Sequence, residues 1–129
     1  MEKIELNLNE IESLTKNALI NHGASNWIAT SVAKAVRVAE AKGNLICGLY
    51  YLESYCTQLV SGRVDGTVEP IVSLPKSASI HVDAKYGFAQ AAFERALPLA
   101  LKTVSDTCLL YTSDAADDTP CVDLGGRRI

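Results

Sequence analysis

Apolar and polar residues alternate with a helical period over most of the N-terminal half of the chain. Apolar side chains recur at spacings of three and four in residues 8–19, 26–42 and 47–60, which predicts three amphipathic helices. A glycine follows each stripe, and glycine favours the left-handed backbone found just past a helix C-terminus. Three helices in close succession are expected to pack as a small bundle. The predicted core positions are Leu8, Ile11, Leu14, Ala18 and Leu19, then Ile28, Val32, Ala35, Val36 and Ala39, then Leu49, Leu52, Cys56, Leu59 and Val60.

The starts of the first two helices are marked by capping residues. Residues 4–8 alternate between apolar and polar side chains, which suits a short strand or an extended lead-in. Asn7 or Asn9 can then cap the first helix, and Ser25 is the expected N-cap of the second.

The pattern changes after Gly62. Residues 68–74 and 78–82 are short β-rich runs beside prolines, which predicts edge strands or extended segments. Residues 88–106 return to a helical period, with Pro98 inside it, so a kinked or a split helix is expected. The predicted fold is therefore α+β, with a three-helix bundle in residues 1–62 and the start of an α/β domain in residues 63–107. The apolar positions of the last helix are Phe88, Ala92, Phe93, Ala96, Leu97 and Ala100, and the predicted elements leave part of this face exposed.

The last 22 residues, CLLYTSDAADDTPCVDLGGRRI, follow no structural period. CLLYTSDAAD back-translates to DNA that resembles the transposase mosaic end and adapter of sequencing libraries, and VDLGGRRI to DNA that resembles the flow-cell adapter. We interpret residues 108–129 as a disordered, non-native tail, so that the natural segment ends near Thr107. A genuine acidic disordered tail is the alternative. The aspartates of this segment lack the spacing of a calcium loop, and no metal site is expected.

Composition and charge exclude several classes of function. The chain is 48% hydrophobic and 21% charged, with a net charge of −3, so it has no basic footprint for nucleic acid or an anionic membrane. No segment is long and apolar enough to span a bilayer, and the acidic N-terminus does not resemble a signal peptide. The four cysteines form no CxxC pair, which favours free thiols in a reducing compartment and a cytoplasmic location.

Several segments occur in a fixed order in residues 9–107. Gly23 and Ser25 separate the first two helices, and they are followed by AVRVAEAKGNLICGLYYLESY, LVSGRVDG, EPIV and HVDAKYGFAQAAFERAL. In this order and spacing the chain resembles the N-terminal part of the malate/L-lactate dehydrogenase family, which are non-Rossmann NAD(P)-dependent oxidoreductases. The resemblance implies hydride transfer between NAD or NADP and a 2-hydroxy, 2-oxo or cyclic imino acid, by a homodimer. The family's catalytic histidine and nicotinamide loops are expected downstream of Thr107, so this fragment is expected to hold neither and to be inactive alone.

The family's substrate pocket usually carries Ser-His-Gly and an arginine three residues beyond the glycine. Aligned on Gly48, this chain has Ile46 and Cys47 in place of Ser-His and Tyr51 in place of the arginine, while Tyr55 matches a usual tyrosine. An arginine can hold a carboxylate with two charged hydrogen bonds, whereas tyrosine offers one neutral donor. Either the carboxylate is held elsewhere, or the substrate differs from the common malate or lactate type.

Cys47, Tyr51 and Tyr55 lie at positions i, i+4 and i+8, so a continuous helix would place them on one face. They are the candidates for a substrate-pocket wall, and simple filling of the core between helices is the alternative. No histidine or basic residue lies close to Cys47 in sequence to activate it as a nucleophile. His22 and His81 are not preferred as catalysts.

Two other functions remain open from the sequence. LTKNALINHGASNWIATSVAKAV imitates a DNA-binding helix-turn-helix, although its second helix offers only Lys34, Arg37 and Lys42 and its first carries Glu10 and Glu12. A non-enzymatic helical interaction module is the other alternative.

Overall fold

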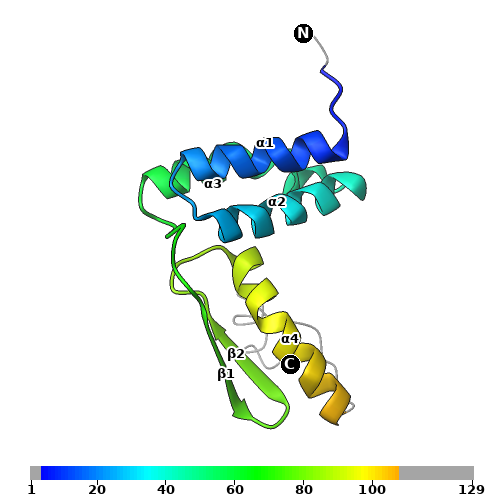
Figure 1. Ribbon diagram of the computed structural model, residues 1–129, viewed down its shortest axis with the longest axis vertical. Helices are drawn as coiled ribbons and strands as arrows, with labels where there is room; N and C mark the ends of the chain where they lie inside the picture. The colour runs from blue at the N-terminus through cyan, green and yellow to red at the C-terminus, as the bar shows by residue number, and fades with distance from the viewer. Residues whose placement is uncertain (1–3, 108–129) are drawn as a thin grey trace, which may run out of the picture.

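The computed structural model describes residues 4–107 as two parts that contact each other (Figure 1). Three α-helices lie together at one end, and a β-hairpin and a fourth α-helix extend side by side from them. The α+β class and the predicted sequence of helices, hairpin and helix are therefore confirmed. The elements are α1 (Leu8–Asn21), α2 (Asn26–Ala41), the 3₁₀ turns η1 (Leu45–Cys47) and η2 (Leu49–Tyr51), α3 (Leu52–Val60), β1 (Ile71–Lys76), β2 (Ser79–Asp83) and α4 (Ala89–Thr107).

Helix α1 begins with a capping box. Asn7 Oδ1 accepts hydrogen bonds from the main-chain N–H groups of Asn9 and Glu10, each at 3.0 Å. Glu10 Oε2 accepts the N–H of Asn7 at 2.7 Å in return. Three otherwise unpaired main-chain donors at the helix start, those of Asn7, Asn9 and Glu10, are satisfied in this way. Asn7 is thus the cap, and the described residues before it form an extended lead-in rather than a strand.

The turn between α1 and α2 is held by the loop that precedes the hairpin. Ser25 occupies the N-cap position of α2, as predicted, but its side chain makes no capping bond. Its main-chain N–H instead donates to the carbonyl of Gly66 at 2.8 Å. A Cβ at position 66 would lie 2.8 Å from Ala24 Cα and 2.6 Å from Leu59 Cδ2, so the close approach of these segments requires glycine.

The third helix begins later than the sequence pattern predicts. The prediction of one helix over residues 47–60 is wrong in its first part, because η1 and η2 precede α3 and Gly48 separates them. Gly48 has φ −93° and ψ −139°, which is outside the helical region. The N–H of Leu49 donates to Glu40 Oε1 at 2.7 Å. This bond joins residues that are nine apart in the sequence. The three- and four-residue spacing of apolar side chains, from which the helix was predicted, does not indicate such a bond.

Strands β1 and β2 form a two-stranded antiparallel hairpin, and within residues 4–107 neither strand has a second strand partner. Val72 is opposite Val82, and the register is irregular between Ser73 and Lys76. Pro75, which cannot donate to a strand partner, lies in that irregular segment. The proline therefore sits where sheet pairing is already interrupted.

Helix α4 continues through Pro98 as one element, so the proline does not split it. Phe88, just before the helix, is buried, as are Ala91, Ala92 and Ala96 within it. Phe93, Leu97 and Leu101 are exposed in the structure. An exposed apolar face on this helix was expected from the sequence pattern and is confirmed for the described residues.

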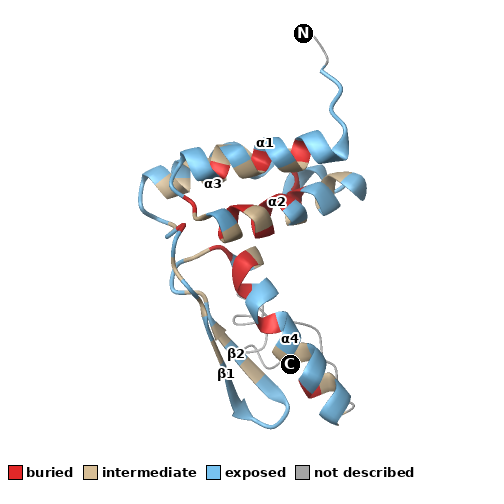
Figure 2. Cartoon of the chain, in the orientation of Figure 1, coloured by how far each residue is buried: buried red, intermediate tan, exposed pale blue. Residues whose placement is uncertain are grey.

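The core lies where α1, α2 and the beginning of α4 meet, and the hairpin and the far end of α4 are mostly exposed (Figure 2). The predicted α2 stripe is well buried at Ile28, Val32 and Val36. The predicted α1 stripe is only partly buried: Leu19 is fully buried, whereas Leu14 is 45% exposed. The largest fully buried side chains are Leu19, Ile28, Val32, Val36 and Thr15.

Arg95 connects α4 to the bundle and to the segment before β1. Its guanidinium carbon lies 4.2 Å from the centroid of the Trp27 ring, in a cation–π contact. The same guanidinium donates from Nε and Nη2 to the two carboxylate oxygens of Glu69 at 3.2 and 3.1 Å. Arg95 thus links α4 to Trp27 of α2 and to Glu69 before β1 through a partly exposed cation–π and ion-pair contact.

The tail interpretation concerns residues 108–129 and lies outside the described residues. Within residues 4–107, none of the helices combines the length and the hydropathy that a transmembrane segment requires.

Candidate functional site

A row of aromatic rings runs from the start of α3 to the start of α4. Tyr50 and Tyr51 meet edge to face with centroids 5.8 Å apart, and Tyr51 and Tyr55 lie 6.0 Å apart. Tyr55 meets Phe88 edge to face at 5.5 Å. Edge-to-face geometry at these distances is favourable between rings. The row passes from the exposed Tyr50 to the buried Phe88, so one end faces solvent and the other is core.

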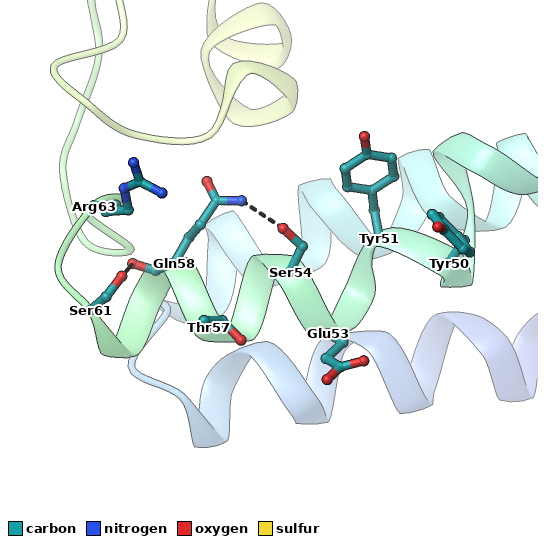
Figure 3. Close-up of a pocket in the computed structure, with 8 residues that line it drawn as sticks. All are labelled: Tyr50, Tyr51, Glu53, Ser54, Thr57, Gln58, Ser61 and Arg63. Atoms are coloured by element: carbon teal, nitrogen blue, oxygen red, sulfur yellow. Dashed lines mark hydrogen bonds between the residues drawn. The ribbon is translucent and has the colours of Figure 1, made fainter.

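The outer end of this row borders an open hollow of about 750 Å³ along α3. Figure 3 shows Tyr51, Gln58 and Arg63 on one side of the helix, while Glu53 and Thr57 point to the opposite side. Gln58 Nε2 donates to Ser54 Oγ at 2.9 Å, which orients the amide along the helix. The hollow is lined by phenol, hydroxyl, amide and guanidinium groups and by the Glu53 carboxylate, and its donor groups can bind a polar molecule.

The structure brings two of the three predicted pocket residues together. Tyr51 and Tyr55 are neighbours. The ring of Tyr55 packs on Phe88, and its hydroxyl accepts a hydrogen bond from Gln90 Nε2 at 3.1 Å. Tyr51 is 41% exposed and borders the hollow. Cys47 lies in η1, before the break at Gly48, and is exposed. The continuous helix that would align Cys47 with the tyrosines is not formed, so the one-face argument for Cys47 fails.

The two described cysteines should differ in reactivity. Cys47 is exposed, whereas burial raises the pKa of the Cys56 thiol and lowers its thiolate fraction at neutral pH. We expect iodoacetamide to alkylate Cys47 severalfold faster than Cys56 in the native protein, as measured by peptide mass spectrometry over time. In urea the two rates should converge. Equal native rates would contradict the placement of Cys47 at the surface.

Sequence reasoning missed Glu40 and Gln90, which support this site from other elements. Glu40 comes from the end of α2 and Gln90 from the first turn of α4. Glu40 acts on Leu49, nine residues later, and Gln90 acts on Tyr55, 35 residues earlier. Neither residue belongs to a motif with a local signature, so only the folded chain reveals them.

The remaining polar candidates have local structural roles. His22 Nδ1 lies 2.7 Å from the carbonyl of Ala18 at the end of α1, and His81 is exposed on β2. The main-chain N–H of Thr67 donates to Asp65 and, with the Thr67 hydroxyl, lowers the pKa of that carboxyl. Within residues 4–107, His, Cys, Asp and Glu side chains form no group of three that could hold a metal ion.

The helix-turn-helix alternative loses part of its electrostatic support. Arg37, on the helix that would enter the groove, pairs with Glu12 of α1 at 3.2 Å. This ion pair draws one of the few cations of that helix toward α1.

The chain matches known proteins over most of its length. The profile of the family described as malate/L-lactate dehydrogenase matches residues 6–111. The chain is 28% identical over 133 residues to Delta(1)-pyrroline-2-carboxylate reductase of Ancylobacter novellus, covering 96% of this chain and 39% of the relative. It is 37% identical over 99 residues to (2R)-3-sulfolactate dehydrogenase (NADP(+)) of Chromohalobacter salexigens, covering 74% of this chain and 29% of the relative.

A solved structure of a related reductase has a similar fold. The crystal structure of delta1-piperideine-2-carboxylate reductase from Pseudomonas syringae superposes with a TM-score of 0.76 at 28% identity. That match covers 81% of this chain and 31% of the solved chain. The chain therefore spans less than two fifths of the length of these relatives. The family profile covers well over half of the chain, and the chain belongs to the malate/L-lactate dehydrogenase family.

Proposed function

We propose that this chain is the N-terminal part of an NAD(P)-dependent oxidoreductase whose substrate is a cyclic imino acid or a 2-oxo/2-hydroxy acid. The observation that carries the proposal is the family match over residues 6–111. Relatives named for pyrroline- and piperideine-2-carboxylate and for sulfolactate support it, because all these substrates carry a carboxylate beside the reacting carbon. Among these substrate classes we favour a cyclic imino acid.

In this proposal the nicotinamide supplies or accepts the hydride, and the described residues contribute to the substrate side. Residues 1–62 form the helical bundle, and residues 63–107 begin the domain that binds cofactor and substrate. We place the proton-transferring histidine and the nicotinamide loops in the part of the parent protein that follows Thr107, so the fragment itself is inactive. The parent is proposed to be a cytoplasmic homodimer.

Tyr51 is the proposed contact to the substrate carboxylate. It borders the hollow with its ring partly exposed, and its phenol can donate one hydrogen bond to a carboxylate oxygen. Cys47 and Tyr55 are proposed to flank it, Cys47 from the preceding turn and Tyr55 as the ring that supports Tyr51. A single neutral donor binds a carboxylate less strongly than an arginine fork does, which favours a substrate that has further contacts elsewhere.

The test is an assay of the protein encoded by the uninterrupted gene. We expect oxidation of NADPH or NADH with Δ1-piperideine-2-carboxylate or Δ1-pyrroline-2-carboxylate at about 1 s⁻¹ or faster, a typical enzymatic rate. Oxaloacetate and sulfopyruvate serve as comparison substrates. Light scattering of the same sample measures whether it is a dimer.

The matched control is the 129-residue chain itself. We expect it to show no turnover and no saturable NADPH binding by calorimetry. Micromolar binding by this chain would contradict our placement of the cofactor site. The proposed function would be contradicted if the full-length protein turned over none of the four substrates.

A further inference from the structure

Glu40 reaches from the end of α2 into the turn that carries the tyrosines. Its Oε1 accepts the main-chain N–H of Leu49 at 2.7 Å in a partly buried environment. Leu49 is the first residue of η2, and the first N–H groups of a helical turn have no partner within that turn. The carboxylate therefore caps the turn from the preceding helix, nine residues earlier, much as a local N-cap side chain would.

Gly48 provides the space that this carboxylate occupies. Gly48 is buried, and a Cβ built there would overlap Glu40 Oε1 and lie 2.6 Å from its Cδ and 2.9 Å from its Cγ. The neighbour that would have to move is the end of a flexible side chain. An alanine at position 48 would thus displace the carboxylate from the N–H of Leu49 rather than break the backbone of the bundle.

We propose that Glu40 is a positioning residue, which together with Gly48 sets the turn that presents Tyr50 and Tyr51. The N–H of Tyr51 bonds to the carbonyl of Gly48 at 3.3 Å, so the placement of η2 determines where the Tyr51 phenol lies. The neighbouring rings at 5.8 and 6.0 Å then follow that placement. Only the statement that this phenol meets a substrate rests on the proposed function.

The test measures hydrogen exchange and chemical shift at the Leu49 amide in the ¹⁵N-labelled 129-residue protein, with no substrate present. Glu40→Ala removes the acceptor, and Gly48→Ala displaces it. Each variant is expected to lower the protection of the Leu49 amide about tenfold, the scale of a lost hydrogen bond to a charged group. The double variant should lose no more than either single variant, because both remove the same bond.

Two variants separate positioning from general destabilisation. Glu40→Gln keeps an oxygen acceptor of the same length, so it should retain most of the protection while the Leu49 amide resonance moves upfield. Glu94→Ala removes an exposed carboxylate of α4 and should leave Leu49 unchanged. If Glu40→Ala does not fold, the chemical shift of the Leu49 amide in Glu40→Gln is the deciding measurement. A changed shift supports the proposal, and an unchanged shift overturns it.

Unchanged Leu49 protection in Glu40→Ala, or additive losses in the double variant, would overturn the proposal. The ring resonances of Tyr50 and Tyr51 should move in Glu40→Ala, with the exposed Tyr86 as an internal reference. Because the experiment contains neither substrate nor cofactor, a negative enzymatic assay would leave its outcome unaffected.

Discussion

Replacement of Phe88 by alanine is expected to lower the free energy of unfolding by about 3–5 kcal/mol. Phe88 is 5% exposed, belongs to the main core and packs edge to face on Tyr55. It lies just before α4 and anchors that helix to the three-helix bundle. Truncation removes a large buried side chain and leaves a cavity between the two parts of the molecule. Urea unfolding followed by circular dichroism measures the loss.

Phe93 supplies the matched control for this prediction. It lies within α4, close to Phe88, and has the same side chain, but it is 59% exposed. Phe93→Ala should change the free energy of unfolding by about 0.5 kcal/mol or less, as is usual for surface substitutions. Equal losses in the two variants would show that α4 does not dock through Phe88.

Replacement of Leu19 by alanine is expected to cost about 2–5 kcal/mol of the free energy of unfolding. Leu19 has no exposed surface and belongs to the core that α1 shares with α2. The cavity would lie inside the bundle, where close packing leaves little room for collapse. The same urea experiment measures this loss.

Leu14→Ala is the control, because sequence periodicity predicts the same buried stripe for both leucines. Leu14 is 45% exposed, so its truncation should cost about 1 kcal/mol or less. A loss at Leu14 equal to that at Leu19 would mean that the face of α1 is covered in solution. The two leucines therefore test the observed burial rather than the periodic pattern.

The helices and their ends could largely be predicted, because the forces that specify them are local. Apolar spacing of three and four located α1 and α2 within a few residues, and glycine marked the ends of the helices. Gly23, Gly43 and Gly62 all adopt positive φ, the backbone that a helix C-terminus favours. The choice between Asn7 and Asn9 as the cap was open, since either could precede the first turn. The reciprocal bonds with Glu10 decide it.

The candidate site was predicted less well than the fold. The periodic pattern extended the third helix through Gly48 and so placed Cys47 beside the tyrosines. The structure breaks the helix there, since the Glu40 carboxylate holds the N–H of Leu49 and fills the space above Gly48. The pairing of Tyr51 with Tyr55 survives, because α3 begins directly after Tyr51.

The sequence by itself determined the class of fold, the order of the elements and the resemblance to a family, since these follow from local periodicity and from motifs in series. Tertiary structure alone decided which members of an apolar stripe are buried and where α3 begins. It also decided that Arg95 stacks on Trp27 and pairs with Glu69. These contacts join residues far apart along the chain, and their partners are set by how the helices pack against one another.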